Sequence, residues 1–317
     1  MHPFISICIP AYNRITYLER LLDSITEQTY KDFEVIVSDD SSEEDVLHLC
    51  EKYTSRINLH YQKNVIPLGT PENWNAAIKR AKGQWIKLMH DDDWFASKYA
   101  LELFANAAKE NQDSFIFCDY INIYESGKKD KIITPEKYRI NILKKEPAIL
   151  LAKNFIGPPS VVMHNNDGRH FYDKKLKWLV DIDMYCRRIE DNNVTHISKA
   201  LVNVGISKSQ VTAAVKNVGT VEIPEHFYFL EKTGTYKLKN ILIYDYWWRF
   251  IRNFNIRDSS DFSKYGYNGS VPVILKKMIS FQKKVSPSLL QKGIISKLLM
   301  AGHFISNKKF IAPLRKP

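Results

Sequence analysis

The sequence lacks the features that would place the chain across a membrane. None of its apolar runs reaches the roughly 18 residues that a membrane-spanning helix needs. No lysine or arginine precedes its first apolar run, which stops at Pro10, so we expect no secretory signal. The 317 residues are 44% apolar, which is enough for one large α/β domain with an appendage or for two modest domains.

Cysteine is scarce, with four residues in the whole chain. The four lie far apart, match no metal-ligand spacing and fall in apolar segments, so we expect buried thiols in a reducing compartment. They are Cys8, Cys50, Cys118 and Cys186.

Acidic residues are missing from the last part of the chain. No Asp or Glu follows Asp261, whereas eleven Lys and Arg do. The remainder is balanced, with 35 Lys and Arg against 35 Asp and Glu, so the net charge of +11 belongs to the tail. A local excess of this kind favours a local anionic partner, such as a membrane face or a lipid-linked substrate, over general nucleic-acid binding.

Strand-like and helical patterns alternate through the first hundred residues. Strand-like apolar runs occupy residues 4–9, 33–37, 57–61 and 85–89. Helical spacing occurs at residues 17–25 and 46–53, and a third helix is predicted to have Thr70 as N-cap, Pro71 at its first position and Gly83 as its stop. This order predicts βαβ units and a parallel sheet, which binds ligands outside the carboxyl ends of its strands.

The second half is less regular. Strand-like segments occupy residues 114–118, 160–163 and 194–204, and a helical pattern occupies residues 179–189. Beyond about residue 220 the pattern becomes helical and aromatic, and from 271 to 309 it is basic and amphipathic.

The most informative motif is His90-Asp91-Asp92-Asp93-Trp94, which directly follows the apolar run at 85–89. Buried carboxylates repel one another and lose hydration, so three together need a counter-ion, and oxygen ligands suit Mg²⁺ or Mn²⁺. Such a metal usually also holds a substrate phosphate. The alternative is a solvated acidic turn that caps a helix starting near Ser97.

Four ordered motifs together resemble the family-2 glycosyltransferases of the GT-A fold. They are residues 9–14 (Ile-Pro-Ala-Tyr-Asn-Arg), residues 37–42 (Val-Ser-Asp-Asp-Ser-Ser), the series Asn64, Gly69, Asn73, Asn75, Ala81 and Gly83, and residues 90–94. The resemblance covers the first hundred residues. It implies a Rossmann-like, mostly parallel sheet flanked by helices in a catalytic domain at 1–215, with a nucleotide-sugar half at 1–95 and an acceptor half at 96–215. A helical, basic extension is predicted at 216–317.

The resemblance also implies a donor site. The residues it assigns to donor binding are Pro10, Ala11, Tyr12, Arg14, Asp39, Asp40, Asn73, Asp91 and Asp92. An aromatic ring such as Tyr12 can stack on a base, and a carboxylate such as Asp39 can accept hydrogen bonds from the base or the ribose. The alternatives are a turn aromatic covering the sheet for Tyr12, and an N-cap pair for a helix at Glu43 for Asp39 and Asp40.

The acidic motif departs from the family pattern, because His90 stands where the first Asp is expected. Asp92 is therefore the leading metal ligand, and Asp91 and Asp93 face the metal, its waters or the donor sugar. We interpret His90 as a wall of the pocket, with the role of replacement ligand as the alternative.

A second acidic segment, residues 178–188, resembles the family helix whose carboxylate acts as general base, and the match assigns this role to Asp181. Val180 stands where the family often has Glu. The alternative for Asp181 is a helix cap, and Asp183 with Arg187 is interpreted as an ion pair along one helix face.

Residues 205–212 resemble the family loop that closes over the diphosphate, with Gly205 and Ser207 in place of its Arg and His. Lys208 is a solvated loop lysine in our interpretation, although its charge could replace the missing one.

The basic tail, 271–317, has two interpretations. In the first, it forms helices that lie on an anionic surface, with Trp247 and Trp248 at the lipid interface. In the second, its helices pack on the catalytic domain and their basic face is solvated.

The whole pattern predicts a cytoplasmic, peripherally membrane-associated, metal-dependent inverting glycosyltransferase. It would move a sugar from a nucleotide-diphosphate donor to a glycan or lipid-linked acceptor in bacterial surface polysaccharide synthesis, without contacting nucleic acid. One alternative is a catalytically silent protein of the same fold that binds glycans or membrane surfaces. A nucleotidyltransferase is a weaker alternative, because it would need a Gly-rich, basic phosphate loop after the first strand.

Overall fold

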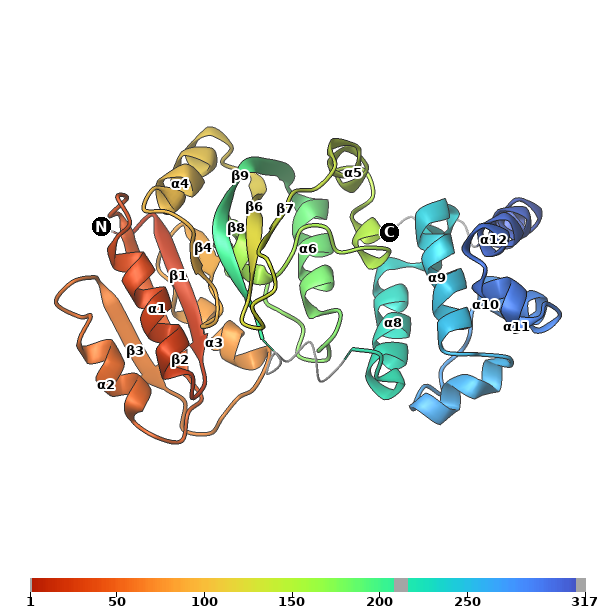
Figure 1. Ribbon diagram of the computed structural model, residues 1–317, viewed down its shortest axis with the longest axis horizontal. Coiled ribbons are helices and arrows are strands. Elements are labelled where there is room, and N and C mark those ends of the chain that lie inside the picture. Colours follow the sequence, from red (N-terminus) through yellow and green to blue (C-terminus); the bar gives the residue numbers. More distant parts are fainter. Residues whose placement is uncertain (1, 208–215, 312–317) are drawn as a thin grey trace. The chain divides into compact units, whose positions relative to one another are not determined.

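A parallel group of four strands forms one half of the sheet, in the order β3-β2-β1-β4. The computed structural model, in which residues 2–207 and 216–311 are described, is shown in Figure 1. Its first four strands are β1 (Ile5–Ala11), β2 (Phe33–Asp39), β3 (Leu59–Lys63) and β4 (Trp85–Leu88). Every residue of β1 and β2 is buried, as expected for a parallel sheet that is covered on both faces.

Three helices connect these strands: α1 (Ile15–Thr26), α2 (Asp45–Glu51) and α3 (Glu72–Arg80). The chain steps one way across the sheet from β1 to β3 and then returns past β1 to β4. Because such crossovers are right-handed, α1 and α2 lie on one face and α3 on the other (Figure 1). The reversal leaves the carboxyl ends of β1 and β4 side by side, which is where ligands bind in sheets of this kind.

The predicted start of α3 is wrong by one residue. The helix begins at Glu72, and Pro71 takes the N-cap position without a side-chain cap hydrogen bond. Thr70 therefore lies before the cap and does not act as one. The helix ends at Arg80, with the Ala81 backbone already extended, two residues before the predicted stop at Gly83.

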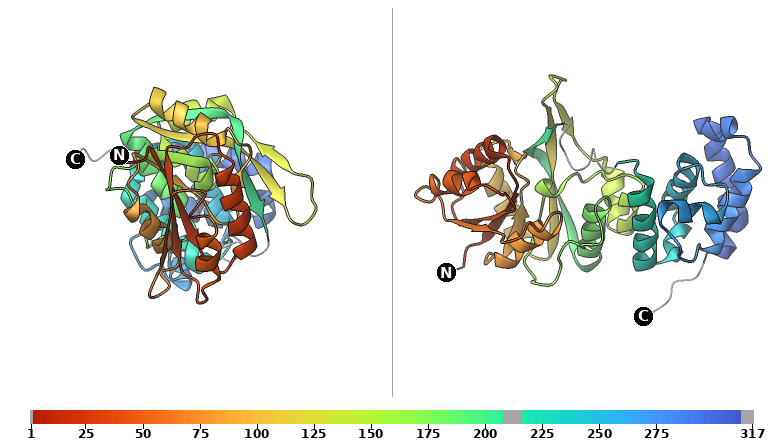
Figure 2. Two further views of the ribbon diagram at one scale, coloured as in Figure 1. Left: turned by 90° about the vertical axis from the view of Figure 1, so that its left-hand side faces the viewer. Right: turned by 90° about the horizontal axis from the view of Figure 1, so that it is seen from below.

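The second half of the sheet is mixed. In order from β4 it contains β8 (Val162–Asn165), β6 (Ser114–Tyr124), β9 (Asn193–Ile206) and β5 (Trp94–Phe95), and β7 (Lys131–Ile133) pairs with β6 alone. β6 and β9 run parallel, whereas β8, β5 and β7 pair in antiparallel fashion. Figure 2 shows the β6–β7 hairpin projecting from the sheet. The predicted α/β class, a sheet with mostly parallel pairing flanked by helices, is confirmed.

Further helical segments occur between residues 100 and 191 of the sequence. They are α4 (Ala100–Glu110), α5 (Lys137–Leu143), α6 (Val180–Asp191) and the short 3₁₀ segments η1 (Pro147–Leu151) and η2 (Pro159–Val161). Tyr99 precedes α4 as its N-cap residue, so the acidic triplet is not the cap of that helix. The four cysteines are buried free thiols, as predicted.

The chain divides into two compact units, Met1–Pro147 with Phe155–Gln210, and Ala148–Asn154 with Val211–Pro317. The second unit is helical. It contains α8 (Gly219–Thr233), η3 (Thr235–Lys239), α9 (Ile241–Asn253), η4 (Ser259–Tyr265), α10 (Val273–Lys283), α11 (Pro287–Gln291), α12 (Gly293–Asn307) and η5 (Lys308–Phe310). The division of residues 1–215 into a donor half and an acceptor half stays a prediction.

Two tryptophans of α9 lie in the protein core, contrary to the prediction from the sequence. Trp247 and Trp248 are both fully buried in the second unit. Trp247 meets Phe227 and Phe250 edge-on, and the Trp248 indole N–H donates to the hydroxyl of Ser296 over 3.1 Å. The interpretation of this pair as a lipid-interface cluster is wrong, because the two indoles form the core of the unit. Among the described residues, no helix combines the length and apolar character needed to span a bilayer.

Candidate active site

The donor residues predicted from the first two motifs meet at the carboxyl ends of β1 and β2. Ala11 and Asp39 are register partners there, and the Asp40 amide donates to the Ala11 carbonyl over 3.0 Å. Pro10 and Ala11 are buried within β1. Tyr12 comes directly after the strand, with 59% of its surface exposed. The ring of Tyr12 therefore does not cover the sheet and is free to receive a planar ligand.

Asp39 and Asp40 have different surroundings. The Asp39 carboxylate is fully buried and accepts hydrogen bonds from the Ser41 amide and the Tyr61 hydroxyl, each over 2.8 Å. The Asp40 carboxylate accepts from the amides of Leu68 and Gly69 over 3.0 and 2.8 Å. Because α2 begins only at Asp45, neither aspartate caps it. Asp40 instead fixes the loop that follows β3.

Asn73 lies beside this pair, but its amide is committed to the protein. Its Nδ2 donates to the Ala11 carbonyl over 3.3 Å, and its Oδ1 accepts from Asn64 over 3.0 Å. The Asn64 amide nitrogen also donates to Asp40 over 2.8 Å. These contacts tie α3 to the end of β1, so Asn73 shapes the site from behind.

The acidic triplet is folded into the protein and is not splayed into solvent. Asp91, Asp92 and Asp93 are 8%, 8% and 2% exposed. Arg14 reaches them from the loop after β1, with its Nη1 atom 3.1 Å from Asp92 Oδ2 and 3.7 Å from Asp91 Oδ1. The backbone N–H of Tyr12 also donates to Asp91. The first and fourth motifs therefore form one site at the carboxyl ends of β1 and β4.

The electrostatics of the triplet favour a bound cation. Burial and the neighbouring charge of Asp92 raise the pKa of Asp91 to about 7. The same two causes raise the pKa of Asp93 well above its ordinary value. Burial lowers the pKa of His90, which keeps the imidazole neutral. Three crowded carboxylates beside a neutral imidazole make a site that a divalent cation would stabilise.

The donor set fits Mg²⁺ or Mn²⁺. Among the described residues, His90, Asp92 and Asp93 form a candidate metal cluster, each offering one ligand atom within 4.8 Å of the others. The Nε2 atom of His90 is buried and has no hydrogen-bond partner in the described part of the chain. One nitrogen and two carboxylate oxygens suit Mn²⁺ well and also accept Mg²⁺. His90 is both a candidate ligand and a wall, since its ring packs on Trp74 at 4.7 Å.

Asp181 lies in the first turn of α6 and does not cap it. Leu179 is the N-cap residue, and no side-chain cap hydrogen bond is present. The Asp181 Oδ1 atom is buried without a hydrogen-bond partner in the described chain, and burial raises the pKa of this carboxyl to about 7. The Asp183–Arg187 ion pair predicted for the same helix is confirmed, at 2.9 Å. Asp181 is thus left with a free, buried oxygen.

Two aromatic rings link Asp181 to the acidic triplet. Its charge acts on the hydroxyl of the buried Tyr172. The Tyr172 ring meets Trp74 edge-on at 5.0 Å, and Trp74 in turn contacts His90. A chain of contacts through Tyr172 and Trp74 therefore connects the predicted base with His90 beside the predicted metal ligands.

Several residues of the site were not found from the sequence. The Ser160 hydroxyl accepts from the His90 amide over 2.9 Å and also bonds to Asp93. Lys87 is fully buried in β4, and its ammonium donates to the Ser160 carbonyl. The Arg20 guanidinium donates to the Asp92 carbonyl over 2.9 Å. Of these residues, only Lys87 could have been identified from the sequence, because it is a lone charged residue inside an apolar strand.

In the loop at 205–212, the structure explains why Gly205 stands where the family has Arg. The Gly205 amide donates to Asp93 Oδ1 over 3.1 Å. A Cβ atom on this residue would lie 2.5 Å from the Asp92 carbonyl oxygen, so the position has no room for a side chain. Lys208 lies outside the described residues.

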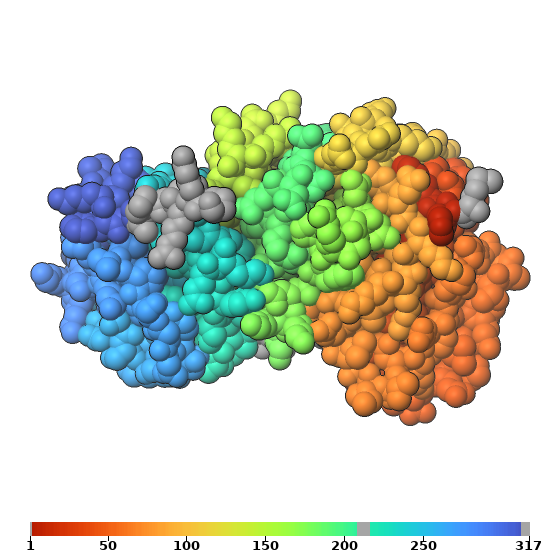
Figure 3. All heavy atoms as spheres, turned by 180° about the vertical axis from the view of Figure 1, so that it is seen from behind, coloured from red at the N-terminus to blue at the C-terminus, as the bar shows by residue number. Residues whose placement is uncertain are grey.

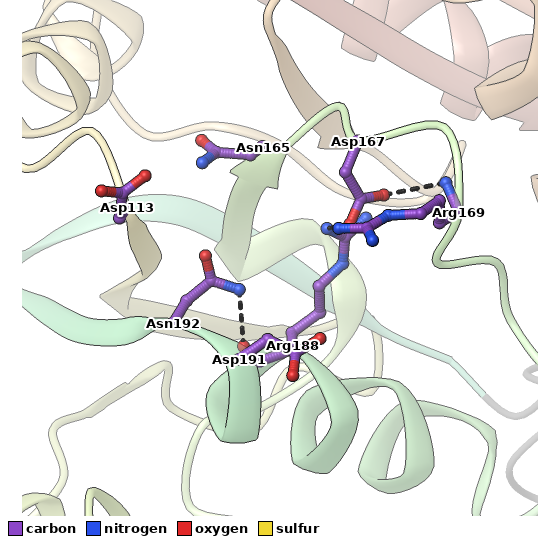
Figure 4. Close-up of a pocket in the computed structure, with 7 residues that line it drawn as sticks. All are labelled: Asp113, Asn165, Asp167, Arg169, Arg188, Asp191 and Asn192. Atoms are coloured by element: carbon purple, nitrogen blue, oxygen red, sulfur yellow. Dashed lines mark hydrogen bonds and ion pairs between the residues drawn. The ribbon is translucent and has the colours of Figure 1, made fainter.

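A separate polar hollow of about 450 Å³ lies in the same unit (Figure 4). Asn165 pairs with Trp85 at the start of β4, so this hollow belongs to the amino end of that strand, opposite the acidic triplet. An ion pair between Arg188 and Asp167, at 2.8 Å, crosses it. Its position makes it no part of the candidate active site.

Comparison with known proteins agrees with this geometry. The family model described as glycosyl transferase family 2 matches residues 6–164. An uncharacterized glycosyltransferase of Rickettsia prowazekii is 25% identical over 222 residues, which are 68% of each chain. The chondroitin synthase of Pasteurella multocida is 29% identical over 210 residues, 63% of this chain and 20% of that protein.

Two solved structures have the same fold. Residues 1–349 of S. aureus TarS in complex with UDP-GlcNAc match at a TM-score of 0.62 and 16% identity, over 96% of this chain and 92% of that one. The Pyrobaculum calidifontis mannosyltransferase PcManGT in complex with GDP-Man and Mn²⁺ matches at 0.50 and 13% identity, over 99% and 77%. The predicted resemblance is confirmed, and the chain belongs to glycosyl transferase family 2.

Proposed function

We propose that this glycosyltransferase takes its sugar from a nucleoside-diphosphate donor and transfers it with inversion in a reaction that depends on a divalent metal. The observation that carries the proposal is the joining of Arg14, Tyr12 and the buried acidic triplet at the ends of β1 and β4. The complexes of TarS with UDP-GlcNAc and of PcManGT with GDP-Man support a nucleotide-sugar donor.

On the donor side, Tyr12 offers an exposed ring for the base. Asp39 would accept a hydrogen bond from the base or the ribose through the buried carboxylate that also accepts from Ser41 and Tyr61. His90, Asp92 and Asp93 would hold Mg²⁺ or Mn²⁺. When bound, this ion supplies positive charge that stabilises the departing nucleoside diphosphate. Arg14 adds a permanent positive charge beside the same carboxylates and can bind a phosphate oxygen.

On the acceptor side, Asp181 acts as the general base. Its carboxylate takes the proton of the acceptor hydroxyl while that oxygen bonds to the anomeric carbon and the bond from this carbon to the diphosphate breaks. Its pKa of about 7 suits this role, because a base is most effective when its pKa lies near the working pH. A single displacement inverts the anomeric configuration and needs no covalent nucleophile.

We further propose that the acceptor is a hydroxyl of a growing surface glycan or of a lipid-linked saccharide. The similarity to a chondroitin synthase, whose name describes polysaccharide assembly, supports this choice. The eleven cations of the tail support an anionic or lipid-linked partner over a free neutral sugar.

A panel of nucleotide sugars, including UDP-GlcNAc and GDP-mannose, tests the donor assignment. Melting temperature is measured for each with Mn²⁺ and with EDTA, since a ligand that binds only the native state raises it. We expect one donor class to raise the melting temperature with Mn²⁺ alone and to release nucleoside diphosphate slowly. If none of the panel does either, the protein is not a nucleotide-sugar enzyme and the proposal is wrong.

A further inference from the structure

The helix α12 has an outer face that differs from an ordinary solvated surface. Ile294, Leu298 and Ile305 are 79%, 69% and 76% exposed. Steps of four and seven residues place them within a narrow arc of one helix face. Ala301 and Gly302 fill the space between them, so this face presents no polar side chain along three turns. A helix on a protein surface normally turns its polar face to water.

The opposite face of α12 fixes the helix to the second unit. Ser296, Met300 and His303 are buried there. The His303 imidazole is hydrogen-bonded to the Tyr244 hydroxyl over 2.7 Å, and the Trp248 indole N–H donates to Ser296. Because both ends of this inner face are anchored, the helix cannot rotate to bury Ile294, Leu298 and Ile305. Figure 3 shows the dark blue residues of α12 at the surface of this unit.

Lysines flank the apolar face. Lys292 and Lys297 are exposed at its beginning, and Lys308 and Lys309 are exposed beyond its end. Lys283 and Lys284 at the end of α10 are also exposed, and no acidic residue follows Asp261 in the sequence. Of these lysines, Lys283 acts on the carboxyl group of Asp258. An apolar strip framed by lysines is the pattern of a helix that lies in the interface of an anionic bilayer.

We propose that α12 is the membrane-binding element of this protein, inserting Ile294, Leu298 and Ile305 among the acyl chains of an anionic lipid surface while the lysines contact the headgroups. Long lysine side chains can reach the headgroups while their stems lie along the apolar layer. A second copy of the chain is a poorer occupant, because it would bring an equally basic surface against this one. The inference goes beyond the proposed function and does not depend on it.

Sedimentation of the full chain with lipid vesicles tests the proposal. Vesicles of phosphatidylglycerol with phosphatidylcholine are compared with vesicles of pure phosphatidylcholine. We expect binding to the anionic vesicles alone, weakened by salt. Leu298→Glu should lower the partition coefficient by at least about tenfold, since it puts a charge in place of an apolar side chain that would be inserted among the acyl chains. The double variant Lys297→Gln/Lys308→Gln should weaken binding without affecting the apolar face.

The matched control is Ile132→Glu, which changes an isoleucine of similar exposure, 64%, in β7 of the other unit, and should bind like the wild type. Leu298→Glu should keep the wild-type circular dichroism and any nucleoside diphosphate release, so a loss of lipid binding cannot come from misfolding. Equal binding of Leu298→Glu and wild type to anionic vesicles would refute the assignment. So would a solution dimer that Leu298→Glu dissociates, because the occupant would then be a second copy.

Discussion

Arg14 and Asp92 form an ion pair of 3.1 Å between the loop after the first strand and the loop after the fourth. Their separation of 78 residues in sequence shows how the sheet assembles the site, because β1 and β4 are adjacent in it. The guanidinium also lies 3.7 Å from Asp91. One arginine thus partly neutralises two carboxylates that would otherwise repel each other.

Arg14→Met should weaken donor binding. The change removes the positive charge proposed to meet a phosphate oxygen, and a hydrogen bond to a charged group is worth about 1.5–3 kcal/mol, or roughly 10- to 100-fold in affinity. Nucleotide titration at saturating Mn²⁺ measures the loss. Arg56→Met, at an arginine paired with Asp23 at the surface, should change the affinity little. Equal effects of the two variants would remove Arg14 from the donor site.

Asp92→Asn should abolish metal-dependent donor binding and lower transfer by about 10²-fold or more, the cost of losing a charge-stabilising group in an active site. Without metal the variant should melt no lower than the wild type, because the charge of Asp92 is a cause of the raised pKa values of Asp91 and Asp93. Calorimetric Mn²⁺ titration and thermal melts measure both effects. The exposed Asp45→Asn is the control, and wild-type Mn²⁺ affinity in Asp92→Asn would contradict the metal assignment.

Transfer should rise with pH through about 7 and then level off, because the base must be deprotonated and burial raises the pKa of Asp181 to about 7. Asp181→Asn should keep donor affinity, lose about 10²- to 10⁴-fold in rate and lose this pH step. The measurement is kcat against pH with donor and acceptor saturating. A variant that retained the step would place the base elsewhere.

The raised pKa of the Asp181 carboxyl also predicts that Asp181 destabilises the folded protein at neutral pH. A raised pKa means that the native state binds the proton more tightly than the unfolded state does, so Asp181 reduces stability increasingly as the pH rises from about 4 to about 7. Asp181→Asn should therefore be more stable than the wild type above pH 7, with the difference shrinking in acid. Urea unfolding at several pH values measures it, and a difference independent of pH would show an unshifted carboxyl.

Gly205→Ala should damage the site through its backbone. The added Cβ would lie 2.5 Å from the Asp92 carbonyl oxygen, an overlap that typically costs about 1–3 kcal/mol and would displace the acidic triplet. Gly302→Ala is the matched control, because no atom lies within 4 Å of its Cβ position, and there the change should stabilise the helix by about 0.5–1 kcal/mol. Denaturant unfolding and Mn²⁺ affinity are measured for both. An unaltered Gly205→Ala protein would contradict the close approach.

Trp248→Ala should destabilise the second unit by about 3–5 kcal/mol, the usual cost of removing a buried tryptophan. A membrane role for this indole would instead lower vesicle binding and leave the folded state intact. Tyr99→Ala, at a half-exposed aromatic of the first unit, should have little effect on either property. Chemical unfolding and vesicle sedimentation together separate the two outcomes.

The local sequence pattern was sufficient to predict the strands that build the donor site. The apolar runs of β1, β2 and β4 are recognisable in the sequence, because a parallel sheet covered on both faces needs mostly hydrophobic strands. The polar residues that follow each run were then expected at one edge of the sheet. The same pattern placed the start of α3 one residue too early, because Thr70 and Pro71 resemble a helix start but the backbone becomes helical only at Glu72.

Contacts between segments far apart in the sequence could not be predicted from the local sequence pattern. Ser160 meets the His90 amide 70 residues away, and Trp74 joins His90 to Tyr172. The sequence around Trp247 and Trp248 is equally amphipathic for a core and for a bilayer interface. The packing of α9 against α8 places Trp247 in the core, and its packing against α10 and α12 places Trp248 there.

The amino-acid sequence by itself determined the alternation of strands and helices, the position of the acidic triplet at a strand end and the polarity of the tail, since each depends on residues close together in the chain. The tertiary structure alone decided which charges share the site, how deeply they are buried and which face of α12 remains open. These properties depend on which surfaces exclude water from one another, and that exclusion exists only when segments far apart in sequence have packed.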